Sequence, residues 1–281
     1  MKLSDLYNSF LLDKLSYCAP ASIRYYRGAL DLWFSWLDAR NVSLFQEVTP
    51  EVLKYYLLYL RGRTCKGTTI RNYFRAIYSF LNYCSYEFDL PVIKKIQLPK
   101  NDPEIILPLS QDEGFRLLSS CRSNRDKAIV KLMLDYGLRS SEVRNLNLGD
   151  VSSAGIIIRN SKYNKSRVLP VNSDLLELLD SVPKVDSPAL LNSSCGCRMS
   201  EDAVKCMFQK LKSDSGIQRV HAHLLRHTFA TSYMVNFGNL EYLRLYLGHE
   251  SYDVTQQYIS LSSQALLSAF DIYKIPPVFK K

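Results

Sequence analysis

Apolar positions recur every three to four residues through the N-terminal third of the chain. This spacing places them on one face of a helix, and it predicts helices at residues 4–16 and 19–40. Thr49 precedes a proline and a glutamate, which together mark the start of a third helix. Thr68 or Thr69 can cap a fourth, longer helix, whose aromatic stripe suits a protein core. The first domain is therefore predicted to be helical.

The periodicity stops where this fourth helix ends. The stretch from Leu90 to Ser110 contains four prolines and several lysines and has no helical spacing. This composition is typical of an extended connection between domains. We therefore assign residues 1–92 to an N-terminal domain, 93–106 to a linker and 107–281 to a C-terminal domain.

Helical signals return after the prolines. Ser110 is the expected N-cap of one helix, and Gly137 is expected to end the next. Ser140 can cap a short helix with an acidic first turn, which would place the preceding arginine at a helix entrance. Residues 172–180 and 199–212 have helical spacing as well. These two helices are expected to serve mainly in packing.

A strand pattern interrupts the helices from Gly155 onward. Three isoleucines and an arginine are followed by a polar turn and then by the run RVLPV. Branched apolar residues on both sides of a polar turn predict a β-hairpin, with Lys162 and Lys165 at its tip. The expected fold class is therefore mainly α. It has two domains, of which the N-terminal one is helical and the C-terminal one is α+β with a small hairpin or sheet.

Composition supports a folded protein of two ordinary domains. Hydrophobic residues make up 47% of the 281 positions and charged residues 22%, a profile that excludes a disordered chain. The net charge of +9 and the pI near 9.1 favour an anionic partner such as nucleic acid or an acidic membrane. No apolar run approaches the length of about 20 residues needed to cross a bilayer, and the N-terminus does not resemble a signal peptide. A cytoplasmic protein without a membrane anchor is expected.

The seven cysteines are scattered and odd in number, so free thiols in a reducing compartment are expected. Cys195, Cys197 and Cys206 form a cluster, but C-x-C is not a usual zinc spacing. The chain has neither a glycine-rich phosphate loop nor a carboxylate cluster suited to magnesium. We therefore expect neither a metal nor a cofactor.

The strongest chemical signal lies between Val220 and Leu261, where histidines, arginines and tyrosines gather. His223 and Arg226 are three residues apart, so on a helix they share one face and can reach one ligand. Arginine makes forked, charge-assisted hydrogen bonds to phosphate oxygens, and histidine can add another donor. The pattern therefore favours a phosphate as the ligand.

Phosphoryl transfer would give these residues distinct roles. Two guanidinium groups, of Arg139 and Arg226, can hold nonbridging oxygens and balance the charge of a pentavalent transition state. A tyrosine hydroxyl has a reference pKa near 10 and needs a base to act as nucleophile. His223 is the candidate base, and His249 is the alternative.

The nucleophile and the general acid have several candidates. Tyr258 follows His249 at a short distance, but Tyr246 and Tyr252 lie nearer to that histidine in the chain. The departing 5′ oxygen is a poor leaving group, so a lysine that donates a proton would complete the set. Lys162 on the hairpin fits that role, and Lys165 is a second candidate.

Four segments occur in an order and at separations that resemble the tyrosine recombinases, also called the phage integrase family: GLRSSE, SKYNKSRVLPV, HLLRHTFAT and LGHESYDVTQQY. The resemblance to that family's catalytic domain covers roughly residues 107–261, and the helical part before it is similar to the family's core-binding, SAM-like domain. The resemblance assigns six residues to catalytic positions: Arg139, Lys162, His223, Arg226, His249 and Tyr258. It also selects Tyr258 among the tyrosines, through the family's spacing from the LGH segment.

The resemblance implies an activity and its partners. The activity is site-specific recombination for integration, excision or resolution of DNA, by cleavage and rejoining through a 3′-phosphotyrosyl intermediate, without metal or ATP. The implied partners are double-stranded DNA with a short inverted-repeat core site and three further copies of the chain. In the cell the protein would be associated with the nucleoid when bound to DNA. A C-terminal helix over residues 262–273 is expected to pass to a neighbouring copy.

Two alternatives share some of these features. A type IB topoisomerase-like nicking-closing enzyme uses the same chemistry without synapsis, and an architectural DNA-binding protein would have an inactive site. The hairpin departs from the family's usual pattern, because Ser161 and Tyr163 stand where glycines often flank the lysine. This departure keeps Lys165 open as the acid. His227 is expected to be buried and hydrogen-bonded, and His221 to lie just before the helix.

Overall fold

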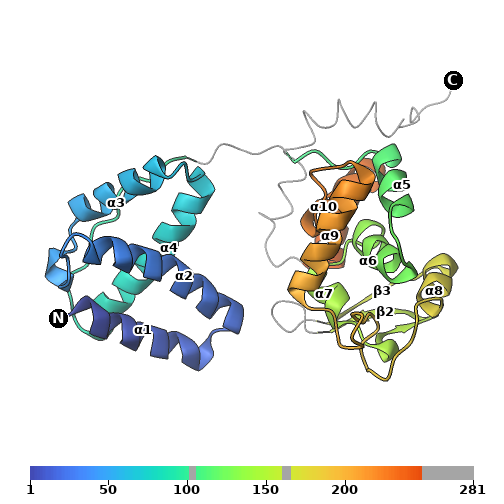
Figure 1. Cartoon of the computed structure of the whole chain (residues 1–281), viewed down its shortest axis with the longest axis horizontal. Helices are drawn as coiled ribbons and strands as arrows, with labels where there is room; N and C mark the ends of the chain where they lie inside the picture. Colours follow the sequence, from blue (N-terminus) through green and yellow to red (C-terminus); the bar gives the residue numbers. More distant parts are fainter. Residues whose placement is uncertain (101–105, 160–165, 249–281) are drawn as a thin grey trace. The chain divides into compact units, whose positions relative to one another are not determined.

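The computed structural model describes residues 1–100, 106–159 and 166–248. The chain divides into two compact units, Met1–Glu104 and Ile105–Lys281 (Figure 1). The first is helical and the second combines helices with a small antiparallel sheet, so the predicted fold class is confirmed. The exact bounds of the domains and of the linker at residues 93–106 stay a prediction.

The N-terminal unit contains, in chain order, α1 (Leu3–Tyr17), α2 (Pro20–Asp38), the 3-10 helix η1 (Phe45–Glu47), α3 (Pro50–Gly62) and α4 (Gly67–Glu87). The predicted start of α3 is confirmed, because the Thr49 side chain accepts a hydrogen bond from the Val52 N–H at 3.4 Å. The predicted threonine cap of α4 is wrong. Lys66 holds the N-cap position, and its carbonyl accepts the first helical bond from Ile70 N at 3.0 Å.

Aromatic rings form the centre of this unit. Trp33 of α2 and Phe80 of α4 are fully buried, with ring centroids 6.0 Å apart. Phe10 of α1 meets Phe80 edge to face at 5.6 Å, an arrangement that the ring quadrupoles favour. The aromatic stripe of α4 is therefore core, as predicted.

The proline-rich segment after α4 has neither helix nor strand over residues 89–100. Its backbone is nevertheless attached to the helical unit: Ile96 N donates to the Tyr78 hydroxyl at 2.9 Å, and Arg71 Nε donates to the Pro99 carbonyl at 2.8 Å. These bonds satisfy backbone groups that a strand would otherwise pair.

The C-terminal unit contains α5 (Gln111–Ser119), α6 (Asn124–Leu134), α7 (Ser140–Asn145), the 3-10 helix η2 (Leu148–Asp150), β1 (Val151–Ser152), β2 (Gly155–Ile158), β3 (Arg167–Leu169), α8 (Ser173–Asp180), α9 (Glu201–Ser215), α10 (Ala222–Phe237) and α11 (Leu240–Leu247). The predicted Ser110 cap of α5 is confirmed. Its hydroxyl accepts from Glu113 N at 3.2 Å while the Glu113 carboxylate accepts from Ser110 N at 2.8 Å, a complete capping box.

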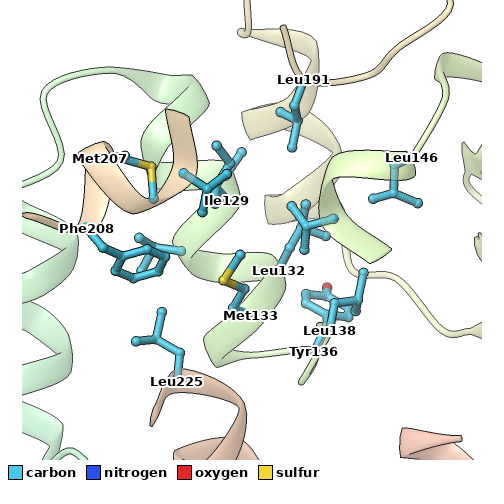
Figure 2. Packing of buried hydrophobic residues seen from close by; sticks show 14 of the residues in the cluster. Ile129, Leu132, Met133, Tyr136, Leu138, Leu146, Leu191, Met207, Phe208 and Leu225 are labelled. Carbon is cyan, nitrogen blue, oxygen red and sulfur yellow. The ribbon is translucent and has the colours of Figure 1, made fainter. Parts of the chain in front are cut away.

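Helix α6 lies at the centre of this unit and packs against α8 and α10. Figure 2 shows Ile129, Leu132 and Met133 of α6 among side chains from other helices, including Phe208 of α9 and Leu225 of α10. All five residues are buried. Burial of such a side chain stabilises the fold by roughly 1.5–3 kcal/mol, so α10 is held firmly against α6.

The sheet has the order β1-β2-β3, with both pairs antiparallel. The predicted hairpin is confirmed: Ile156 pairs with Leu169, and both residues are buried. Gly155 permits this pairing, because a side chain there would place Cβ 2.6 Å from the Leu169 carbonyl oxygen. Strand β1 was not predicted, since two residues are too few to show an alternating pattern. Among the described helices, none is long and apolar enough to cross a membrane.

Candidate active site

Arg139 occupies the N-cap of α7, the position that the sequence pattern gives to Ser140. The predicted serine cap is therefore wrong. Instead the Glu142 carboxylate, three residues on, accepts from Arg139 N at 2.8 Å and from Arg139 Nη1 at 3.0 Å. This acceptor satisfies an orphan N–H at the helix start and at the same time orients the guanidinium group.

Helix α10 carries His223 in its first turn and Arg226 one turn later. Arg226 is only 2% exposed, and a buried charge requires hydrogen-bond partners. Its Nη1 donates to the Gly137 carbonyl at 2.6 Å, and its Nη2 donates to the Leu247 carbonyl at 2.9 Å. The Arg226 guanidinium is thereby held in one orientation.

The two arginines meet at one oxygen atom. Arg139 Nη1 also donates to the Leu247 carbonyl, at 3.3 Å, so both guanidinium groups converge at the end of α11. The last carbonyls of a helix have partial negative charge and attract cations. The geometry shows that Arg139 and Arg226 can bind a single oxygen between them.

The Glu142 carboxylate interacts with three arginines. Glu142 is 6% exposed, lies 3.7 Å from Arg226 Nη1, and accepts from both terminal nitrogens of Arg167, at 2.9 and 3.0 Å. Burial raises the pKa of Glu142, but the hydrogen bonds and charge of Arg167 and the Arg139 N–H outweigh it, so the net shift is downward. The ionised carboxylate and three guanidinium groups leave this cluster with a net charge of +2.

Neither Glu142 nor Arg167 was predicted as part of the site. Glu142 could have been found from the sequence, because it follows Arg139 by three residues, the spacing between the two residues of a capping box. Arg167 had no local signal beyond its place in the hairpin strand, because its partner is 25 residues away.

Arg139, His223 and Arg226 all line one cavity of about 600 Å³. His223 remains exposed there. Its pKa is lowered, first by partial desolvation among the surrounding side chains and then by the positive charges of Arg226, His221 and Arg139. A neutral imidazole at neutral pH is able to accept a proton. The structure therefore brings together three of the six predicted site residues; Lys162, His249 and Tyr258 lie outside the described residues.

Helix α9 contributes a further set of polar groups to this cavity. Lys205, Gln209 and Lys212 line it from positions that share one face of the helix, and Arg144 of α7 lines it as well. Sequence reasoning assigned α9 to packing and missed this face. The signal was present in the spacing of four and then three residues between polar side chains.

Tyr246 was an open candidate for the nucleophile. Its ring stacks on Phe229 with centroids 5.3 Å apart, and burial raises its pKa to about 12. A raised pKa makes the hydroxyl harder to deprotonate and thus a poorer nucleophile. Tyr252, the other open candidate, and Lys165 lie outside the described residues.

The two remaining histidines lie where they were expected. His221 is the N-cap residue of α10, just before the helix. His227 is 4% exposed, and its Nε2–H donates to the Ile106 carbonyl at 2.8 Å. His227 thus links α10 to the first described residue of the C-terminal unit.

This link should make the stability of the chain depend on pH. Burial is the main cause that lowers the pKa of His227, so the unfolded chain binds its proton more readily than the folded chain. The free energy of unfolding should therefore decrease as the pH falls through the ordinary pKa near 6.5. We expect the wild-type Tm to drop between about pH 7.5 and 5.5, and the drop to be smaller in His227→Gln. Substitution of the exposed His221 by Gln is the control, and equal pH slopes in wild type and His227→Gln would contradict the assignment.

All seven cysteines are free thiols. Among the residues that the structure describes, no cluster of three or more His, Cys, Asp or Glu side chains could hold a metal ion.

Residues 108–265, more than half of the chain, match the sequence pattern of the Phage integrase family. The chain belongs to this family. A tyrosine recombinase XerC of Psychromonas ingrahamii is 28% identical over 269 residues, which cover 90% of each chain. The matched range includes all six residues that the sequence motifs assign to catalytic positions.

Two solved structures share the fold of this phage integrase family member. One is the XerH site-specific recombinase bound to its palindromic difH substrate, with a TM-score of 0.73 at 21% identity over 90% of this chain and 80% of that one. The other is a lambda integrase tetramer bound to a Holliday junction, with a TM-score of 0.74 at 14% identity over 92% of this chain and 77% of that one.

Proposed function

We propose that this chain is a site-specific DNA recombinase that cleaves and rejoins DNA strands through a 3′-phosphotyrosyl intermediate. The observation that carries the proposal is the convergence of Arg139 and Arg226 on the Leu247 carbonyl oxygen, beside a cavity that both arginines line, in a chain of the phage integrase family. The relative XerC is itself named a tyrosine recombinase. The family and the cationic site therefore point to the same reaction.

In this reaction the arginine pair would bind the scissile phosphate. A phosphodiester carries one negative charge, and a second develops as the pentavalent transition state forms. The net charge of +2 around Glu142 matches this total. Each such donor contributes about 10²–10³ in rate when it is aimed at developing charge. Because the guanidinium groups are held by protein acceptors beforehand, little reorganisation is needed on binding.

The covalent steps would use the remaining motif residues. The Tyr258 hydroxyl attacks phosphorus, and its proton passes to His223. The bond to the 5′ oxygen breaks, and that oxygen takes a proton from Lys162, so the 3′ phosphate stays on the tyrosine. Attack by a 5′ hydroxyl reverses these steps and regenerates a phosphodiester, so no nucleotide is needed. His249 and Lys165 are the alternatives for the base and the acid.

The surroundings of the site suit double-stranded DNA as the substrate. Arg144, Lys205 and Lys212 line the same cavity as the arginine pair, and the chain carries a net charge of +9. Lysine and arginine contacts to phosphates supply most of the affinity for DNA irrespective of its sequence. A short core site with inverted repeats would present equivalent phosphates to two copies of the chain.

The alternative functions are not favoured. A type IB topoisomerase or an inactive architectural protein would use the same family fold, but the named relatives are recombinases. An inactive site would also be free to lose its ionised cluster, whereas Arg139, Glu142 and Arg226 are mutually hydrogen-bonded or paired.

A labelled duplex mixed with a second duplex that contains the same site tests the proposed function. We expect strand exchange between the duplexes in the presence of EDTA and without ATP, because the phosphotyrosyl bond conserves the energy of the broken phosphodiester. Denaturing gels would show a recombinant strand and a protein–DNA adduct. Relaxation of a supercoil without exchange would favour the topoisomerase, and strict magnesium dependence of cleavage would point to a metal nuclease.

The proposed assembly on DNA is a tetramer, as in the lambda integrase complex on a Holliday junction. An apolar groove of about 520 Å³ supports an exchange of C-terminal helices between neighbours. The groove is lined by residues of α5, α6 and α10, among which Phe115 and Phe237 are 70% and 72% exposed. The apolar stripe predicted within residues 262–273 has the character needed to cover it.

Deletion of residues 262–281 tests this exchange. If the segment docks on a neighbour, the truncated chain should keep a Tm within a few degrees of wild type but lose cooperativity in DNA binding and cleave poorly. Titration of a two-site duplex measures cooperativity. The double substitution Phe115→Ser and Phe237→Ser in the full chain should have the same effect from the acceptor side. A large fall in Tm with cooperativity preserved would show that the helix docks on its own chain.

A further inference from the structure

Arg167 reaches from strand β3 into the cationic cluster. Its side chain is 12% exposed, and it makes a forked pair with Glu142, from Nη1 to Oε1 at 2.9 Å and from Nη2 to Oε2 at 3.0 Å. Two parallel bonds fix the plane of the carboxylate as well as its position. A lysine could supply the charge but not this geometry.

Because the carboxylate is fixed, its other contacts are fixed too. Oε1 also accepts from Arg139 Nη1 at 3.0 Å, and Oε2 accepts from Arg139 N at 2.8 Å and lies 3.7 Å from Arg226 Nη1. A free carboxylate could rotate to form its own forked pair with Arg139. Such a pair would take up the donors that a phosphate needs.

The charge balance leads to the same conclusion. Without Arg167, the group of Arg139, Arg226 and Glu142 would have a net charge of +1. With Arg167 the net charge is +2. In a buried cluster the interaction between charges is stronger than in water. The Arg167 charge therefore keeps the arginine pair electropositive, although its terminal nitrogens are occupied by the carboxylate.

Arg167 also supports the turn at Gly248, which ends α11 in a left-handed conformation with φ +66°. A Cβ atom at Gly248 would lie 3.0 Å from Arg167 Nη1 and 3.5 Å from its Cζ, so the guanidinium lies against this backbone. Arg139 Nη2 donates to the Gly248 carbonyl at 3.5 Å. In sequence, Gly248 immediately precedes His249.

We propose that Arg167 is a positioning residue: it clamps Glu142 in the orientation that leaves Arg139 and Arg226 available to the scissile phosphate, and it supports the turn before His249. This inference rests on the proposed function. Arg167 is not among the residues that line the cavity with Arg139 and Arg226, and its terminal nitrogens are bound to Glu142, so it acts through the carboxylate.

The test compares Arg167→Met and Arg167→Lys with wild type in single-turnover cleavage of a nicked duplex that traps the adduct. Arg167→Met should cleave about 10²–10³-fold more slowly, the scale of one lost electrostatic contact, while the Kd for duplex DNA changes by less than about fivefold. Arg167→Lys should be intermediate, because it keeps the charge and loses the fork. Arg159→Met is the matched control, since Arg159 directly follows β2 and pairs with the buried Asp150. It should cleave at the wild-type rate.

A second substrate separates electrostatics from a merely structural role. A neutral methylphosphonate at the scissile position lacks the phosphate charge. The decrease in cleavage rate from wild type to Arg167→Met should therefore be smaller on this substrate than on the ordinary phosphodiester. A structural defect would slow both substrates equally, and that result would overturn the proposal.

The double variant Arg167→Met/Glu142→Gln removes both partners and restores a net charge of +2. It should cleave no more slowly than Arg167→Met, so the two effects are not additive. The double variant also allows the test if Arg167→Met does not fold, because it contains no buried carboxylate that has lost its Arg167 partner. Additive losses, or wild-type cleavage by Arg167→Met, would refute the inference. Failure of wild type itself to form an adduct would instead refute the proposed function.

Discussion

Tyr258→Phe is expected to abolish covalent attachment to DNA while the duplex is still bound with nearly unchanged affinity. Only the hydroxyl is removed, so the nucleophile is lost and the aromatic ring is kept. In the proposed mechanism no other group can form the 3′-phosphotyrosyl bond. A suicide duplex with a nick near the cleavage site, followed by a denaturing gel, measures the adduct, and a gel-shift titration measures binding.

Tyr246→Phe provides the matched control for this loss. The Tyr246 ring stacks on Phe229 and its pKa is raised to about 12, so removal of its hydroxyl should leave cleavage close to wild type. Tyr252→Phe should also retain adduct formation. A denaturant-resistant adduct in the Tyr258→Phe protein would show that another residue is the nucleophile.

Arg139→Ala and Arg226→Ala are expected to have the next largest effects. Each removes one of the two guanidinium groups that would bind the scissile phosphate, so single-turnover cleavage should fall by about 10²–10³ in each variant, with a smaller loss of DNA affinity. The effect is larger on the transition state than on the ground state because the second negative charge appears only during reaction.

The two substitutions should differ in their effect on stability. Arg226 is buried and donates to two backbone carbonyls, so Arg226→Ala leaves those acceptors unpaired and should lower the Tm. The Arg139 side chain is 29% exposed, so Arg139→Ala should lower the Tm less. Arg226→Lys retains a buried charge and serves as the control for folding. Normal cleavage by a folded Arg139→Ala protein would remove Arg139 from the proposed site.

Several features of the protein followed from the sequence because they depend on neighbours a few residues apart. The Ser110 capping box and the Thr49 cap are set within three or four residues, and the pairing of β2 with β3 is set within one short segment. The shared face of His223 and Arg226 follows from helix geometry alone. The motif order was sufficient to identify the family, which the match over residues 108–265 shows.

Local signals were less reliable where two of them compete. Ser140 is a good capping residue, yet Arg139 holds the N-cap position. The Glu142 carboxylate accepts from the Arg139 N–H and is itself held by Arg167. The α9 helix was read as packing, because its apolar face dominates the pattern. The polar residues next to that face line the cavity, together with Val204 and Phe208.

By itself, then, the sequence determined most of the helices, the pairing of β2 with β3 and the family, since these depend on short-range periodicity and motif spacing. Only the tertiary structure decided how the charges are balanced. Arg139 meets the Leu247 carbonyl across 108 residues of chain, and Glu142 meets Arg167 across 25. Side chains so far apart in sequence come together only when the core around α6 is packed, because that packing fixes α7, β3 and α10 around one buried carboxylate.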